Sequence, residues 1–311
     1  MTDVEARADG TELVLNADDP LVADLGRDRN LDRRAGVTYF GIEDNSQALE
    51  ALPHAFDAKH CRRCGAPYRY ERAFVGHLGH YDCGSCGAGR PKPDVAAESI
   101  SLLGMQGSRF LARTPEGTVE IELPLPGLYN VYNALAAIAA AQRLGISLER
   151  IASALADVEA AFGRVETIDV AGTALSIFLI KNPAGANEVL RTLLQEAERL
   201  GGPGLDLWLA LNDGIADGRD VSWIWDADFE LLSARARRIT CAGTRAPEMA
   251  LRLKYAGFPE ESITVDPEIE HSLDSAIDAA DGQLFALPTY TALIELRTML
   301  ARRGLAKEYW Q

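Results

Sequence analysis

Two closely spaced cysteine pairs constrain this chain more than any other feature of its sequence. Cys61 and Cys64 form one CxxC pair, Cys83 and Cys86 form a second, and a glycine directly follows each pair. Two thiolates three residues apart can bind one side of a tetrahedral metal ion, and two such pairs complete a four-sulfur shell. The glycine allows a tight turn behind each pair. The sequence therefore predicts a closed, structural zinc site of the zinc-ribbon type, in an insert over residues 57–93.

Other residues in and around this insert do not change the prediction of a four-cysteine metal site. His60, His77 and His80 are alternative ligands, but the four cysteines suffice. The fifth cysteine, Cys241, ends a predicted strand and is expected to be a buried core thiol. The polar, acidic start of the chain is unlike a secretory signal. Without a secretory signal, paired cysteines indicate metal binding rather than disulfides.

The amino-acid composition limits the kinds of protein that this chain can be. The chain has 311 residues, 47% of them hydrophobic, which suits about two globular domains. Its formal net charge of −15 disfavours nonspecific binding to nucleic acid, because the phosphates would be repelled. No apolar run is long enough to predict a membrane span, which needs about 18 residues.

The first domain, residues 1–165, is predicted to be of the α/β class. It opens with an apolar run that ends in Asn16-Ala-Asp-Asp-Pro20, which is typical of a buried strand followed by a turn. Further strands are expected from hydrophobic alternation, and two helices from helical spacing before a glycine stop. The predicted strands are 13–15, 37–42, 99–103, 109–113 and 119–123, and the predicted helices are 133–144 and 148–162.

The second domain, residues 166–311, alternates strands with helices. This pattern predicts a doubly wound parallel sheet with its binding residues at the carboxyl ends of the strands. The predicted strands are 175–180, 207–211, 238–241, 262–265 and 284–287, and the predicted helices are 186–200, 229–236, 246–256, 272–280 and 290–302.

Several polar residues at element ends are candidates for nucleotide binding. Asn130 and Asn133 lie at the start of a predicted helix, where amide groups could read an adenine edge or serve as a cap and a surface residue. Arg164, taken alone, could be an ordinary surface cation. Lys181 and Asn182 lie between a strand and a helix, where they could meet phosphate oxygens. Each of these signals is weak alone.

Taken in order, these motifs resemble a known family. The Asn16–Pro20 segment, the Gly127–Ala137 helix start, Gly163-Arg164 with Glu166, and Asn182-Pro183 are similar to the Mur ligases, which use ATP to join amino acids to cell-wall precursors. The four-cysteine insert and residues 211–229 resemble the MurT branch of that family, the ligase-type subunits of lipid II isoglutaminyl synthase. The resemblance covers the chain from residue 11 to about residue 300.

The resemblance implies a function. MurT subunits pair with a GatD-like glutamine amidotransferase, which releases ammonia from glutamine, and with ATP and Mg²⁺ they activate the D-glutamate α-carboxylate of lipid II for amidation. It assigns a catalytic role to Asp220, which would complete the partner's Cys–His pair across the interface, and nucleotide contacts to Asn130, Asn133, Arg164, Lys181 and Asn182. Without it, Asp220 would be a turn aspartate like Asp217, Asp226 and Asp228.

The chain also departs from the family. None of its five lysines follows a glycine, so it has no GKT or GKS phosphate loop. We therefore expect the sequence to be incomplete at its N-terminus and the chain alone not to hydrolyse ATP. Two alternatives stay open: a non-catalytic, zinc-stabilised scaffold for an amidotransferase, and another Mur-type amino-acid ligase. The expected location is cytoplasmic, with peripheral association at the inner face of the cell membrane, where lipid II lies, left open.

Overall fold

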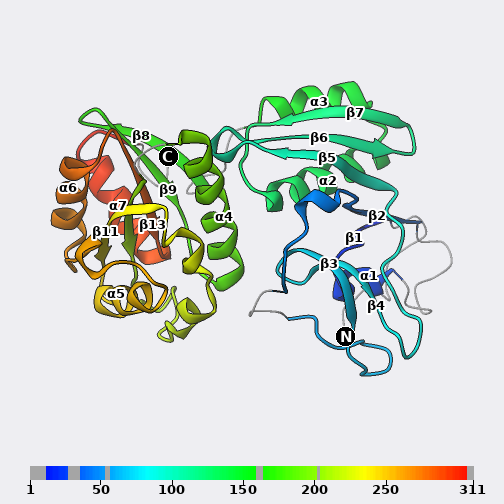
Figure 1. The fold of residues 1–311 in the computed structure, drawn as a ribbon. Coiled ribbons are helices and arrows are strands. Elements are labelled where there is room, and N and C mark those ends of the chain that lie inside the picture. The colour runs from blue at the N-terminus through cyan, green and yellow to red at the C-terminus, as the bar shows by residue number, and fades with distance from the viewer. Residues whose placement is uncertain (1–11, 27–35, 53–56, 159–163, 202–203, 307–311) are drawn as a thin grey trace. The chain divides into compact units, whose positions relative to one another are not determined.

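The computed structural model describes residues 12–26, 36–52, 57–158, 164–201 and 204–306. The chain divides into two compact units, residues 1–158 and 159–311, which Figure 1 shows with their helices and strands labelled. The sequence-based boundary lies after residue 165. The structural division falls earlier because strand β8 (Arg164–Val170) pairs with β9 (Thr173–Phe178) and so belongs to the sheet of the second unit.

The first unit is built on a mixed five-stranded sheet in the order β1-β2-β5-β6-β7. The first three strands in this order run parallel, and the last two pair antiparallel through tight connections. The bounds are β1 (Glu12–Asn16), β2 (Gly36–Ile42), β5 (Val95–Leu102), β6 (Ser108–Thr114) and β7 (Gly117–Leu123). Each of the five predicted strands of this domain overlaps one of these strands.

Two helices cover the sheet of the first unit. Helix α2 (Leu128–Arg143) packs on β1, β2 and β5, and α3 (Leu148–Ala156) packs on β7. The buried residues Leu128, Val131, Leu135 and Ile138 recur at helical spacing, so they form one apolar stripe toward the sheet. Helix α2 begins five residues before the predicted start at 133, directly after Gly127, whose φ of 88° ends the preceding extended chain. Of the helix predicted over 148–162, residues 159–162 lie outside the described part.

The second unit has a six-stranded sheet in the order β12-β11-β10-β13-β9-β8. All neighbours run parallel except the edge strand β8, which is antiparallel to β9 and was not predicted. The remaining strands are β10 (Leu205–Ala210), β11 (Ala236–Ala242), β12 (Ile263–Val265) and β13 (Gln283–Pro288), and the helices are α4 (Pro183–Leu200), α5 (Ala246–Tyr255), α6 (Ile269–Ala279) and α7 (Tyr290–Arg302).

The central strands of this sheet are covered on both faces. Every residue of β10 is buried. Trp208 and Ala210 pack in one core cluster with α6 and α7, while α5 also contacts β10 and β11. Since successive side chains of a strand point to opposite faces, Leu207 and Leu209 fill the other face. This is the arrangement expected for a parallel sheet with an apolar central strand.

One predicted helix is wrong. Residues 229–236 form only a single 3-10 turn, η5 (Phe229–Leu232), and the chain then enters β11 at Ala236. Phe229 and Leu232 are both buried, so one turn is enough to place these two apolar side chains in the core. Among the described helices, none has the length and apolar character needed to cross a membrane.

Candidate functional site

The four paired cysteines converge on one point. Their sulfur atoms all lie within 4.8 Å of one another, with Cys61 Sγ 3.7 Å from Cys86 Sγ and Cys64 Sγ 3.5 Å from Cys83 Sγ. A tetrahedral zinc ion with Zn–S bonds of about 2.3 Å requires sulfur–sulfur separations of about 3.8 Å. The cluster therefore fits a four-coordinate metal, although no ion is part of the structure.

The two cysteine loops have the same backbone geometry. Gly65 N–H donates to Cys61 O at 2.8 Å, and Gly87 N–H donates to Cys83 O at 2.9 Å. Both glycines have a left-handed φ, 74° and 72°, as the tight turn behind each pair requires. Burial opposes ionisation of Cys61, but hydrogen bonds from the backbone amides of Arg63 and Cys64, together with those from the side chains of Tyr68 and Cys86, lower the pKa of the Cys61 thiol to about 6. A thiolate is the form that binds metal.

The predicted alternative ligands have other roles. A hairpin of β3 (Arg69–Val75) and β4 (Leu78–Asp82) joins the two cysteine loops. His80 Nε2 on β4 lies 2.9 Å from Ile42 O, and His77 faces Asp19. His60 is exposed. Among the described residues, no histidine joins the four-sulfur group.

A buried ion pair fixes this cysteine module (residues 57–93) to the sheet of the first unit. Asp18, at the carboxyl end of β1, is fully buried. Its carboxylate accepts from Arg90 Nε at 2.5 Å, Tyr132 Oη at 2.7 Å and Ile42 N at 2.9 Å. Burial raises the pKa of Asp18, and the Arg90 guanidinium is the largest influence that opposes this rise. Arg90 also donates to Glu43 at 2.7 Å.

Sequence reasoning treated Asp18 and Asp19 as turn residues and did not find this pair. The informative signal was the position of Asp18 two residues after a core strand, because polar binding residues gather at the carboxyl ends of such strands. His77 Nε2 lies 3.4 Å from Asp19 Oδ2, an ion-pair distance without hydrogen-bond alignment. This carboxylate raises the pKa of His77.

In the second unit, the loop after β10 carries Asp220. The Asp220 side chain is exposed, and its Oδ1 accepts from Ser222 N at 2.9 Å, at the start of the 3-10 segment η4 (Ser222–Asp226). Hydrogen bonding to Ser222 holds the pKa of Asp220 below its usual value. Asp220 is therefore an exposed carboxylate whose charged form is favoured by hydrogen bonding to Ser222.

A buried asparagine anchors the root of this loop. Asn212, only 4% exposed, follows the last strand residues of β10. Its Oδ1 accepts from Thr244 N at 3.0 Å, and its Nδ2 donates to Thr291 Oγ1 at 3.1 Å and Glu295 Oε1 at 3.3 Å. Asn212 thus joins the carboxyl ends of β10 and β11 to α7.

The residues expected to contact nucleotide differ from one another in burial and in hydrogen-bond partners. Asn130 is buried, with its Nδ2 donating to Pro126 O at 2.8 Å and its Oδ1 accepting from Asn133, which is exposed. Asn182 caps α4 by accepting from Gly185 N at 2.8 Å, and Lys181 beside it is exposed. Arg164 starts β8, but its side chain lies outside the described part.

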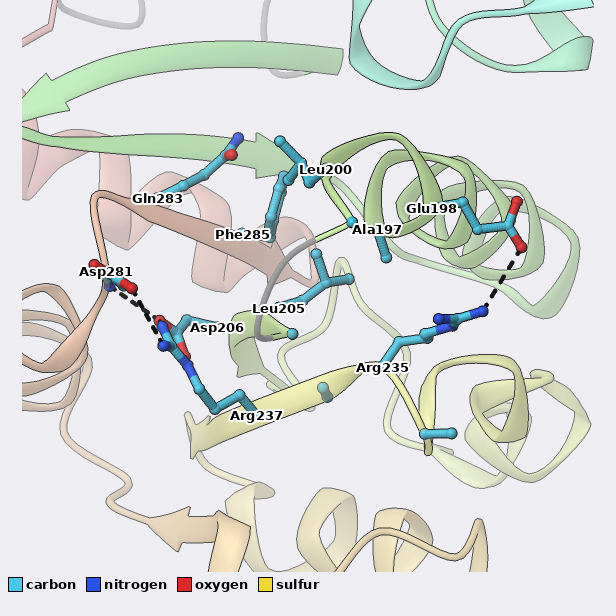
Figure 2. Close-up of a pocket in the computed structure, with 14 residues that line it drawn as sticks. Ala197, Glu198, Leu200, Leu205, Asp206, Arg235, Arg237, Asp281, Gln283 and Phe285 are labelled. Carbon is cyan, nitrogen blue, oxygen red and sulfur yellow. Dashed lines mark hydrogen bonds and ion pairs between the residues drawn. The ribbon is translucent and has the colours of Figure 1, made fainter.

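The hollow in Figure 2 is not a candidate site. It has a volume of about 570 Å³ and is lined by Leu205, Gln283 and other residues at the amino ends of β10, β11 and β13. Ligands of such sheets bind at the opposite, carboxyl edge. The charged residues drawn there are paired, Arg237 with Asp206 and Asp281, and Arg235 with Glu198.

Comparisons with known proteins agree with these features. Residues 179–293 match the family model "MurT ligase C-terminal", and residues 85–141 match "Mur ligase middle domain". The chain is 33% identical over 273 residues to the lipid II isoglutaminyl synthase (glutamine-hydrolyzing) subunit MurT of Streptococcus pneumoniae, which covers 88% of this chain. The chain is a homologue of the MurT subunits. It is also 33% identical over 294 residues to MurT of Staphylococcus aureus, which covers 94% of it.

The MurT homologue spans 59% of the S. pneumoniae relative and 63% of the S. aureus relative. Among solved structures it is similar to a pseudomurein peptide ligase type C from Methanothermus fervidus, with a TM-score of 0.68 and 25% identity over 94% of this chain and 56% of that one. MurF from Acinetobacter baumannii shares the fold, with a TM-score of 0.61 and 20% identity over 95% of this chain and 52% of that one. The fold is thus that of Mur ligases, with mixed sheets.

Proposed function

We propose that this MurT homologue is the ligase-type subunit of a glutamine-dependent enzyme that amidates the D-glutamate α-carboxylate of lipid II. ATP activates the carboxylate, ammonia released from glutamine by a GatD-like partner attacks it, and the product is D-isoglutamine. The observation that carries the proposal is the similarity to MurT subunits across both units, at 33% identity over about nine tenths of the chain.

Asp220 is the residue that we propose to complete the partner's active centre. A glutaminase with a nucleophilic cysteine and a histidine needs a third group that orients the imidazole and stabilises its charged form. An exposed carboxylate that is ionised at neutral pH can do this across an interface. The position of Asp220 within the part matched by the MurT C-terminal model supports this assignment.

Nucleotide binding is proposed for the residues that the family resemblance assigns. Asn133 would read the adenine edge, and Asn130, whose oxygen accepts from it, would hold its amide in place. Arg164 and Lys181 would contact phosphate oxygens, and Asn182 would order the start of α4 beside them. ATP with Mg²⁺ would supply the activating phosphoryl group.

Zinc is proposed as the metal of the four-cysteine cluster. Four thiolate ligands with tetrahedral spacing favour zinc and leave no position for water or substrate, so its role is structural. The cysteine module is fixed to the carboxyl ends of β1 and β2 by Arg90 and His80, which supports a role in holding this edge of the first unit. The cytoplasm, where thiols stay reduced, suits such a site.

Two other functions compete with this proposal. A scaffold would bind the amidotransferase without contributing to chemistry, and another Mur-type ligase would add an amino acid rather than ammonia. The match of residues 179–293 to the MurT C-terminal model argues against the second. The exposed Asp220 carboxylate favours a contribution to chemistry over the first.

The test is to mix the chain with its cognate amidotransferase subunit and to follow both complex formation and ammonia release from glutamine. The proposal predicts a stable complex whose glutaminase rate exceeds that of the partner alone. A complex without faster glutamine hydrolysis would overturn the shared active centre in favour of a scaffold. Absence of a complex would overturn both.

A further inference from the structure

We propose that two clamps, Asp217–Thr291 and Arg252 with the carbonyl groups of Ile224 and Ala227, position Asp220 for its role in the glutaminase centre. Neither clamp includes Asp220 itself. The inference therefore concerns where the Asp220 carboxylate is held and not whether it is exposed. The inference rests on the proposed function of Asp220, and it assigns Thr291 and Arg252 as positioning residues for that reaction.

The first clamp lies three residues before Asp220. Asp217 Oδ1 accepts from Thr291 N at 2.9 Å, and Asp217 Oδ2 accepts from Thr291 Oγ1. Thr291 is in the first turn of α7, where free backbone N–H groups favour a carboxylate. Asp217 therefore caps α7 from a distant loop. Asn212, which also donates to Thr291 Oγ1, joins the same clamp to the end of β10.

The second clamp lies four residues after Asp220. Arg252 on α5 is 4% exposed, and its Nε donates to Ile224 O at 2.9 Å while its Nη2 donates to Ala227 O at 2.7 Å. Its guanidinium also lies over the rings of Trp225 and Phe229, with centroid distances of 5.6 and 5.5 Å. A planar fork of donors fixes two carbonyl groups from separate nitrogens, a geometry that the single ammonium nitrogen of lysine does not reproduce.

Between the clamps, the hydrogen bonds described for residues 218–223 are local. Gly218 has a φ of 85°, and the Asp220 carboxylate accepts from Ser222 N. Since an exposed turn of this kind has little burial of its own, the two clamps determine where the Asp220 carboxylate lies. A shift of about 1 Å in a residue that orients a catalytic group can cost about 100-fold in rate.

The experiment measures glutaminase kinetics of the complex of the full chain with its amidotransferase partner. Thr291→Val removes the hydroxyl donor with little change in shape, Thr291→Ser retains it, and Arg252→Lys retains charge without the fork. We expect Thr291→Val and Arg252→Lys to lower kcat by about 10- to 100-fold with KM for glutamine and complex affinity nearly unchanged. Thr291→Ser should restore the rate. Thr298→Val is the matched control, because the Thr298 hydroxyl on the same helix bonds only Ile294 O among the described residues.

A double-mutant cycle separates positioning from general stability. If the clamp acts through Asp220, adding Thr291→Val to Asp220→Asn slows the enzyme no further. If the rate losses of the two single variants multiply in the double variant, the inference is overturned. It is also overturned if Thr291→Val and Arg252→Lys both keep the native rate while Asp220→Asn is slow, and in that case the proposed role of Asp220 still stands. A native rate for Asp220→Asn would overturn both.

Discussion

Replacing Arg90 by methionine should be among the most damaging single changes in the first unit. The change leaves the fully buried Asp18 carboxylate with the Tyr132 hydroxyl and the Ile42 amide but with no positive charge. Breaking a buried ion pair in this way costs about 3–5 kcal/mol. The matched control is Arg109→Met, because the Arg109–Glu122 pair lies on the surface, where such pairs contribute about 0–1 kcal/mol.

The assay is native-state hydrogen exchange of the backbone amides of β1 and β2, which reports the free energy of local opening without assuming that both units unfold together. A loss of about 3–5 kcal/mol would speed exchange by about two to four orders of magnitude. The loss should shrink as pH falls through the raised pKa of Asp18, because burial favours the protonated carboxyl and a protonated carboxyl no longer needs Arg90. Equal effects of Arg90→Met and Arg109→Met would refute the reasoning, as would a loss that does not depend on pH.

Three further predictions concern the metal, pH and nucleotide. One zinc ion per chain is expected by elemental analysis, and Cys64→Ser should lower zinc retention while Cys241→Ser, at a buried thiol outside the cluster, should keep full occupancy. Because Asp19 raises the pKa of His77, this pair stabilises the fold below about pH 6.5 and the stabilisation is lost as pH rises through the raised pKa. Urea unfolding of native protein and His77→Gln across pH 6–9 should therefore differ most at the acidic end, and a constant difference would contradict the assignment. Asn133→Ala should weaken binding of a fluorescent ATP analogue, with Asn182→Ala weakening it less, and equal binding by native protein and Asn133→Ala would remove Asn133 from the site.

The sequence predicted most elements because their signals are local. The alternation in residues 119–123 and the apolar strands of the second domain depend on nearest neighbours along the chain, and the CxxC spacing fixes its own geometry. Residues 229–236 were misassigned because two apolar residues at helical spacing suit one 3-10 turn as well as a helix. Strand β8 was missed because its pairing with β9 is decided at the sheet edge.

The site could be predicted only in part, for a related reason. Asp18 and Arg90 are 72 residues apart, and nothing local marks either as half of a buried ion pair. In the sequence, Arg252 and Thr291 look like ordinary helix residues. Only the fold brings them to the loop of Asp220. Asp220 itself was found through family resemblance, because an exposed aspartate beside three others carries no distinguishing pattern.

The most direct test of the central claim compares native chain with Asp220→Asn in the complex with the cognate amidotransferase, by the initial rate of ammonia release from glutamine. Asp226→Asn, an exposed aspartate of the same loop, is the control. The account predicts that Asp220→Asn binds the partner normally and abolishes most of the stimulated glutaminase rate, while Asp226→Asn retains it. Equal rates for native chain and Asp220→Asn would contradict the account.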